Sequence, residues 1–170
     1  MMKSVTLAVC LAALSFSNIG TAFAQGAQVP FAGLKVGANS TVEVAADSLS
    51  IDQETGKATF AGNVVVGIEN MRLSAEEIEV VYAAGTEGGT GAISGLIAKG
   101  HVVFSNGEEA AEGDFADLDL EAGEIAMTGN VILTQGQNAL SGQSLRIDLN
   151  TGTAMIEGRV QTIFQTGGSE

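Results

Sequence analysis

The chain has 170 residues, of which 45% are hydrophobic, with one cysteine, one proline and no tryptophan. Seven basic and twenty acidic residues give it a formal net charge of −13 at pH 7. This charge balance excludes a nucleic-acid-binding surface built from Lys and Arg, and the spread of apolar residues along the whole chain argues against a disordered acidic tail.

Residues 1–24 have the parts of a secretory signal peptide. Lys3 gives a positive start, an apolar run covers residues 5–14, and residues 22–24 read Ala-Phe-Ala, the small-x-small pattern of a cleavage site. The run is too short to span a bilayer, which needs about 20 apolar residues. We expect cleavage before Gln25 and secretion rather than anchoring. Removing this segment removes one basic residue and no acidic one, so the mature net charge is −14.

A Gly-x-Val tripeptide recurs along the rest of the chain, and a second block with an acidic or amide residue lies upstream of each copy. The tripeptides begin at Gly62, Gly100, Gly129 and Gly158, and the upstream residues are Asp47, Glu76, Asp114 and Gln143. The upstream residues are 29, 38 and 29 positions apart, so the second of four units carries a nine-residue insertion. Its glycine-rich stretch, residues 84–91, is expected to be a surface loop. Such a repeat sets the architecture of the whole domain.

Each unit has the pattern of two strands joined by a tight turn. Ala58 and Phe60 alternate with Lys57 and Thr59, which is the period of a half-buried strand. Asp or Asn before Gly favours tight turns with Gly at positive φ, and this pattern occurs at residues 52–56, 119–123 and 148–152. We predict an all-β, antiparallel fold of four two-stranded repeats, preceded by a strand at residues 42–46 and sharing one elongated core.

The apolar faces of these strands have two possible uses. They can fill a core, or they can line a trough for alkyl chains. Aromatic residues make up 5% of the chain, so the faces are mainly smooth aliphatic surfaces. On composition alone a filled core is the favoured interpretation, and the trough stays open as the alternative.

No pattern in the chain indicates catalysis, a metal site or a cofactor. His101, the single histidine, takes the place that Asn63, Asn130 and Arg159 have in the other units, which predicts a polar residue at the start of a strand. The Asp-containing turns lack the bidentate Glu that completes a calcium loop, and the glycines near residue 90 have the wrong spacing for a dinucleotide fingerprint. The acidic clusters are interpreted as solvated faces.

Four segments carry a further pattern: residues 44–52, 58–66, 73–78 and 140–164. Together they resemble the LptA, or OstA-like (organic solvent tolerance), family of lipopolysaccharide-transport proteins, over about residues 40–165. The resemblance implies an elongated, open β-jelly roll with an apolar interior. It also implies a periplasmic location in a Gram-negative envelope, a role in outer-membrane assembly and no enzymatic activity.

The resemblance divides the chain into a signal peptide at 1–24, an amino-terminal extension at 25–38, an OstA-like domain at 39–166 and a tail at 167–170. The implied ligand is lipopolysaccharide, whose lipid A acyl chains slide along the interior. The implied partners are an anchored inner-membrane subunit at the N-terminal edge, an outer-membrane barrel at the C-terminal edge and further copies joined head to tail. Residues 42–46 and 159–165 are the predicted strand edges for these contacts.

Strand parity predicts which apolar side chains face the lipid-binding groove, although a slip of one residue would reverse any strand. These residues are Val42, Val44, Leu49, Ile51, Phe60, Val64, Val66, Ile78, Val80, Val102, Phe104, Leu118, Met127, Val131, Leu133, Leu145, Ile147, Ile156, Val160 and Phe164.

Three other interpretations remain open. The chain can be a structural β-repeat that polymerises without lipid, or an anchored OstA-like partner subunit that retains its amino-terminal segment. It can also be an enzyme on a β-scaffold, which would need clustered carboxylates in a polar cleft.

Overall fold

The structure, a computed structural model, describes residues 26–31, 40–52, 54–83 and 92–164. The expected signal peptide and the expected loop at residues 84–91 lie outside them. The described residues form strands and no helix, so none of their segments is a helix that could cross a membrane. This confirms the all-β prediction. The strands are β1 (Ala27–Pro30), β2 (Val42–Ala45), β3 (Ser48–Ile51), β4 (Ala58–Ile68), β5 (Met71–Tyr82), β6 (Ile93–Ser105), β7 (Glu109–Asp119), β8 (Glu124–Gln135), β9 (Asn138–Asp148), β10 (Thr153–Glu157) and β11 (Gln161–Ile163).

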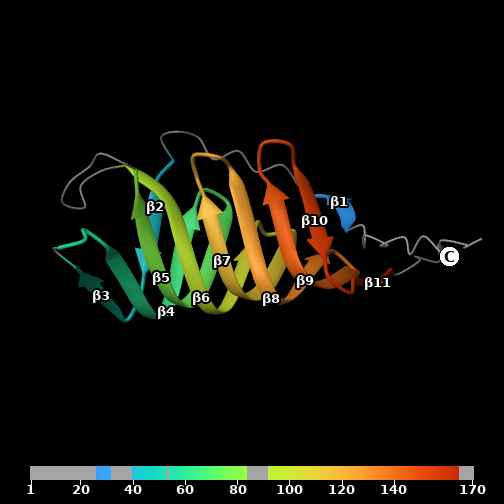
Figure 1. Ribbon diagram of the computed structural model, residues 1–170, viewed down its shortest axis with the longest axis horizontal. Coiled ribbons are helices and arrows are strands. Elements are labelled where there is room, and N and C mark those ends of the chain that lie inside the picture. Colours follow the sequence, from blue (N-terminus) through green and yellow to red (C-terminus); the bar gives the residue numbers. More distant parts are fainter. Residues whose placement is uncertain (1–25, 32–39, 53, 84–91, 165–170) are drawn as a thin grey trace, which may run out of the picture.

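All strand pairs are antiparallel, and their order is β1-β10-β9-β8-β7-β6-β5-β4-β2, with β3 also on β4 and β11 also on β9. The four repeats are therefore the consecutive strand pairs β3–β4, β5–β6, β7–β8 and β9–β10, as the sequence blocks predict. Figure 1 shows the strands side by side along the long axis, with β3 and β4 at one end and β1 and β11 at the other.

Each Gly-x-Val tripeptide lies at a bend of the sheet, inside β4, β6 and β8 and between β10 and β11. Gly62 and Asn63 have φ of 81° and 47°, and the pairing of β4 with β5 shifts between Ala61 and Val64. The other three tripeptides have the same two positive φ angles. Two residues opposite one on the neighbouring strand form a bulge, which bends the strand sharply. Glycine is required at the first position because a Cβ on Gly62 would lie 2.5 Å from Oδ2 of Asp47.

The bends line up across neighbouring strands and fold the sheet into two layers, visible as the curved ribbons in Figure 1. The first layer contains β1, β3 and β10, together with the halves of β4–β9 that lie between β3 and β10 in the pairing order. The second layer contains β2, β11 and the other halves of β4–β9. The couple β2–β3 acts as one bent strand, because its members pair with the two halves of β4. The couple β10–β11 pairs with β9 in the same way.

The prediction that His101 begins a strand is wrong. His101 lies inside β6 with φ of 44°, and its Nδ1 is 2.7 Å from Oε1 of Glu76 at the outer side of the bend. Asn63 donates to Oδ2 of Asp47 over 2.8 Å at the matching bend. The first three tripeptides therefore mark the middle of the long strands β4, β6 and β8, which continue through their bulges into the other layer. The fourth lies between β10 and β11.

The turns that join the two strands of a repeat follow the predicted chemistry. Oδ1 of Asp148 accepts the backbone N–H groups of Asn150 and Thr151 over 2.8 and 3.0 Å, and Gly152 has φ of 65°. Asp52 and Asp119 accept the equivalent bonds in their own turns. The bonds from Thr151 and Asn150 hold the pKa of the Asp148 carboxyl below its usual value, and the bonds from Thr55 and Glu54 do the same for the pKa of Asp52.

The amino-terminal extension contains a strand that the sequence pattern does not predict. β1 pairs with β10, from Ala27 opposite Ile156 to Pro30 opposite Thr153. Residues 159–165 were expected to form the free carboxy-terminal edge. In the structure β11 forms that edge in the second layer, and β1 covers β10 in the first.

Candidate functional site

The space between the two layers is lined by rows of apolar side chains that run across the strands, along the long axis of the molecule. One row in the first layer crosses every strand of that layer, because its residues are successive pairing partners. From one end to the other it contains Leu49, Phe60, Ile78, Ala98, Ala116, Met127, Leu145, Ile156 and Ala27. A parallel row contains Ile51, Ala58, Val80, Leu96, Leu118, Ile125, Ile147, Ala154 and Val29.

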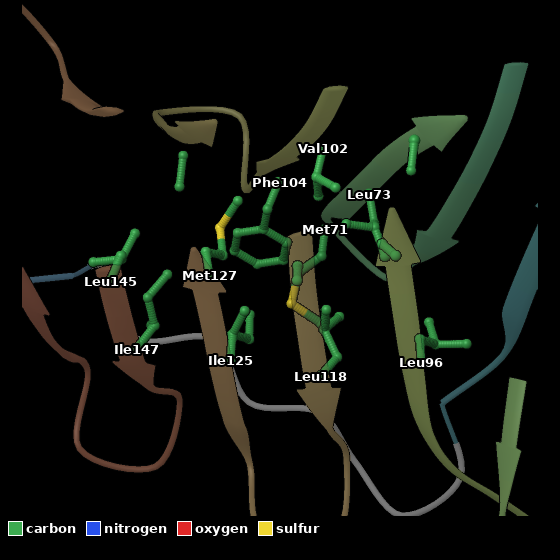
Figure 2. Packing of buried hydrophobic residues seen from close by; sticks show 14 of the residues in the cluster. Met71, Leu73, Leu96, Val102, Phe104, Leu118, Ile125, Met127, Leu145 and Ile147 are labelled. Carbon is green, nitrogen blue, oxygen red and sulfur yellow. The ribbon is translucent and has the colours of Figure 1, made fainter. Parts of the chain in front are cut away.

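The second layer contributes a facing row with the same character. Its members are Val44, Val66, Leu73, Phe104, Ala111, Leu133 and Leu140, which pair in that order from β2 to β9. In Figure 2, Phe104 and Met71 of this layer point toward Met127 and Leu118 of the first layer. The rows therefore enclose one apolar interior without a polar interruption between Phe60 and Ile156.

This interior is closed in the structure. Thirteen of the twenty residues predicted to line a groove are buried: Val64, Val66, Ile78, Val80, Val102, Phe104, Leu118, Met127, Val131, Leu133, Leu145, Ile147 and Ile156. Val42, Val44, Phe60 and Val160 are partly buried against them. The structure also buries interior residues that were not predicted, such as Leu73, Leu96, Ile125 and Leu140. These residues follow the same alternation of inward and outward side chains along their strands.

The other three predicted residues lie at the two ends of the sheet. Leu49 and Ile51 on β3 are 52% and 61% exposed, and Phe164, which follows β11, is 67% exposed. They are exposed because no further strand covers them on the outer side. Each end of the molecule therefore presents apolar side chains beside a free strand edge.

Phe31 covers the interior on the side opposite the bends. Its backbone N–H donates to the carbonyl of Gly152 over 2.9 Å in the first layer, and its ring, 3% exposed, stacks on Phe104 of the second layer. Nε2 of Gln135 donates to the carbonyl of Pro30 over 2.6 Å and to Oε1 of Glu109 over 2.7 Å. This segment thus joins the two layers on the side opposite the bends. No sequence pattern marks Phe31 for this position.

Among the described residues the charged side chains lie on the outside, and Asn106 is the buried polar residue. An ion pair joins Lys57 Nζ to Glu79 Oε1 over 2.6 Å, with the lysine side chain 57% exposed. Within the described ranges, no three His, Cys, Asp or Glu residues come together in a way that could hold a metal ion. The feature that spans the molecule is the apolar interior, which suits a ligand with long alkyl chains.

The fold and sequence match known lipopolysaccharide-transport proteins. The structure is similar to the crystal structure of LptH, described as the LptA homologous periplasmic component of the lipopolysaccharide transport device from Pseudomonas aeruginosa, with a TM-score of 0.65 and 15% identity over 74% of this chain and 95% of that one. This likeness shows the fold, an LptA-type β-jelly roll. No curated protein sequence matches the chain significantly. The family model described as "LptA/(LptD N-terminal domain) LPS transport protein" matches residues 43–153, and the chain therefore belongs to this family of lipopolysaccharide-transport proteins.

Proposed function

We propose that the protein is a periplasmic lipopolysaccharide-binding and transfer protein that shields lipid A acyl chains between its two layers. Its role is transport, with no catalytic step. The observation that carries this proposal is the set of apolar rows that run unbroken across β4–β9 in both layers along the long axis.

The energetics of acyl chains explain why a protein is needed. At about 0.8 kcal/mol per methylene, exposing one chain of about fourteen carbons to water costs on the order of 10 kcal/mol. A continuous interior keeps the chain covered at each step. Because apolar contacts are non-directional, sliding breaks no specific hydrogen bond. The energy for directed movement is then supplied outside this protein.

Entry of lipid requires the two layers to part. Along the interior they are held by apolar contacts such as those of Phe104 with its neighbours (Figure 2). An acyl chain replaces such contacts with similar ones, whereas water does not. The layers remain joined at the bends, where the strands are continuous, so parting would widen the side opposite the bends.

The two free ends support a bridging role between an anchored inner-membrane subunit at the β2–β3 end and an outer-membrane barrel at the β10–β11 end, with further copies joined head to tail. The β10–β11 couple runs from the first layer to the second, and β2–β3 runs from the second to the first. A following copy therefore continues the antiparallel order. Its β2–β3 couple would pair antiparallel with β10–β11, in the same way that β5 pairs with β4.

Photo-crosslinking in cells tests lipid binding. A crosslinking residue replaces Phe60, the second residue of its row, with the outward neighbour Thr59 as control. In a second pair it replaces Met127 deep inside, with Thr128 as control. We expect lipopolysaccharide adducts at Phe60 and Met127 and none at the two threonines. Absence of adducts at both interior positions, in a folded and exported protein, would contradict the proposal.

A structural β-repeat that polymerises without lipid is the second candidate, and the closed interior favours it. Phe60→Arg separates the two functions, since Phe60 is partly buried and stands next to Leu49 at the end of its row. A lipid carrier would stay folded and lose lipid binding. In a protein with a permanently filled core, the substitution would lower the stability of the fold, and neither the parent protein nor the variant would bind lipid.

A further inference from the structure

β1 lies at the position where a second copy would add its own strand. Its four residues form a complete ladder with β10, and Ala27 and Val29 extend the two interior rows of the first layer beyond Ile156 and Ala154. A strand edge accepts one partner at a time, because each backbone N–H and C=O on that side of β10 bonds once across the ladder. The first-layer edge of this end is therefore already occupied.

β3 of a second copy matches this position in direction and register. In the alignment of repeats, Asp47, Leu49 and Ile51 correspond to Glu76, Ile78 and Val80 of β5. Ile78 pairs with Phe60 and Val80 with Ala58 on β4. The matching residues of β10 are Ile156 and Ala154, so Leu49 and Ile51 would take the places that Ala27 and Val29 hold.

We propose that β1 and Phe31 occupy the docking site for β3 of a second copy, so that head-to-tail joining exchanges β1 for β3. The inference rests on the end-to-end pairing proposed above and adds to it an internal competitor. In the second layer, the free edge of β11 is open to β2 of the same second copy, so docking can begin there while β1 is still bound.

The residues of the two strands favour the exchange. Leu49 and Ile51 are more than half exposed on an isolated copy and would become covered, whereas β1 offers the smaller Ala27 and the exposed Pro30. Larger apolar side chains gain more from burial. Cleavage before Gln25 would leave β1 close to a free chain end, from which it can detach without unthreading.

Two double-cysteine variants that share one position test the exchange, since no cysteine lies among the described residues. Gln28 is the partner of Met155 in the ladder of β1 with β10, so Gln28→Cys with Met155→Cys locks β1 in place. By the register above, Ser50 of a second copy would face the same Met155. Ser50→Cys with Met155→Cys should therefore form a disulfide between copies. Thr59→Cys with Met155→Cys is the control, because Thr59 lies one strand further away, on β4 opposite Ser50.

Sedimentation velocity and non-reducing gels give the readout on the full mature protein. We expect the oxidised lock to stay monomeric at concentrations where its reduced form assembles. The Ser50 pair should form linked dimers and the Thr59 pair should not. Adding Phe31→Ala to the Ser50 pair should lower the concentration needed for half-maximal linkage by about tenfold, because more of the protein then has β10 free.

The failures are distinguishable. Equal assembly of the locked and reduced forms would overturn the exchange and leave end-to-end pairing standing. Absence of assembly in both would overturn end-to-end pairing together with the exchange, while lipid binding is decided separately by crosslinking at Met127.

Discussion

The rings of Phe31 and Phe104 stack with their centroids 6.2 Å apart, and this contact links a segment attached to the first layer with a strand of the second. The bends join the layers on one side through continuous backbone. Phe31 joins them on the other side through a side chain at the end of a four-residue strand. The second link can be released without breaking the long strands β4–β9.

Phe31→Ala should detach β1 rather than leave a stable cavity. A core Phe→Ala substitution typically lowers the free energy of unfolding by about 3–5 kcal/mol, and we expect less than this for Phe31 because its segment can leave the fold. Phe104→Ala should have the full effect. Hydrogen exchange should show loss of protection in β1 with β4–β9 unchanged. Retained protection in β1 would contradict this expectation.

Gly62→Ala should destabilise the fold at its bend. The alanine pays about 1–2 kcal/mol for its positive φ, and its Cβ must also push Asp47 aside, for a total of about 2–4 kcal/mol. Gly107→Ala is the matched control, because Gly107 has φ of 95° and nothing within 4 Å of an added Cβ. Urea unfolding should show a clearly larger loss for Gly62→Ala. Equal losses would mean that the contact with Asp47 carries no cost.

Asp148→Asn should reduce the loss of stability in acid. The folded-state pKa of Asp148 is lowered by its bonds from Thr151 and Asn150, so its charge contributes stability above the unfolded pKa of about 3.9. That contribution disappears as the pH falls through the folded pKa. Urea unfolding at pH 7 and at about pH 3 should give a smaller difference for the variant than for the parent protein. An unchanged difference would rule out this contribution.

Leu49→Asp should block joining of copies without unfolding the protein. Leu49 is 52% exposed, so the free energy of unfolding should change by less than about 1 kcal/mol. In an assembled pair the carboxylate would be buried beside Ile156 without a partner, which is costly. Sedimentation should show loss of assembly for Leu49→Asp and retained assembly for Ser50→Asp, which faces outward. Similar behaviour of the two variants would argue against pairing through β3.

Much of the fold follows from the sequence because its signals are local. Alternation over residues such as Ala58 and Phe60 identifies the strands, and the Asp-x-x-x-Gly segments identify the turns. The bends are not recognisable in this way. Two residues in left-handed conformation can either begin a strand or interrupt one, and which of these happens depends on whether the residues on both sides pair with a neighbouring strand. In β4 both sides pair with β5, and Gly62 lies against Asp47.

The amino-terminal strand escapes prediction for a different reason. Residues 27–30 read Ala-Gln-Val-Pro, which is too short for a clear period and ends in a residue that lacks a backbone donor. Its partner β10 lies at the other end of the chain, and only the completed sheet places the two side by side. Leu49, Ile51 and Phe164 are exposed because they lie at the ends of the sheet. The alternation along a strand predicts which face of the sheet a side chain occupies, but it does not predict whether the strand lies at the end of the sheet or inside it.

The bent strands also impose a counting rule on how this protein can lengthen. The six strands β4–β9 and the two couples β2–β3 and β10–β11 make eight bent strands, an even number, so the two ends run in opposite directions and an antiparallel junction can form between copies. Adding or losing a single bent strand would make the ends run the same way and leave only parallel pairing. Growth by whole hairpins keeps the number even and so preserves the antiparallel junction. β1 is a ninth strand in the first layer alone, and while it stays bound the first layer has an odd number of strands and its two ends run the same way.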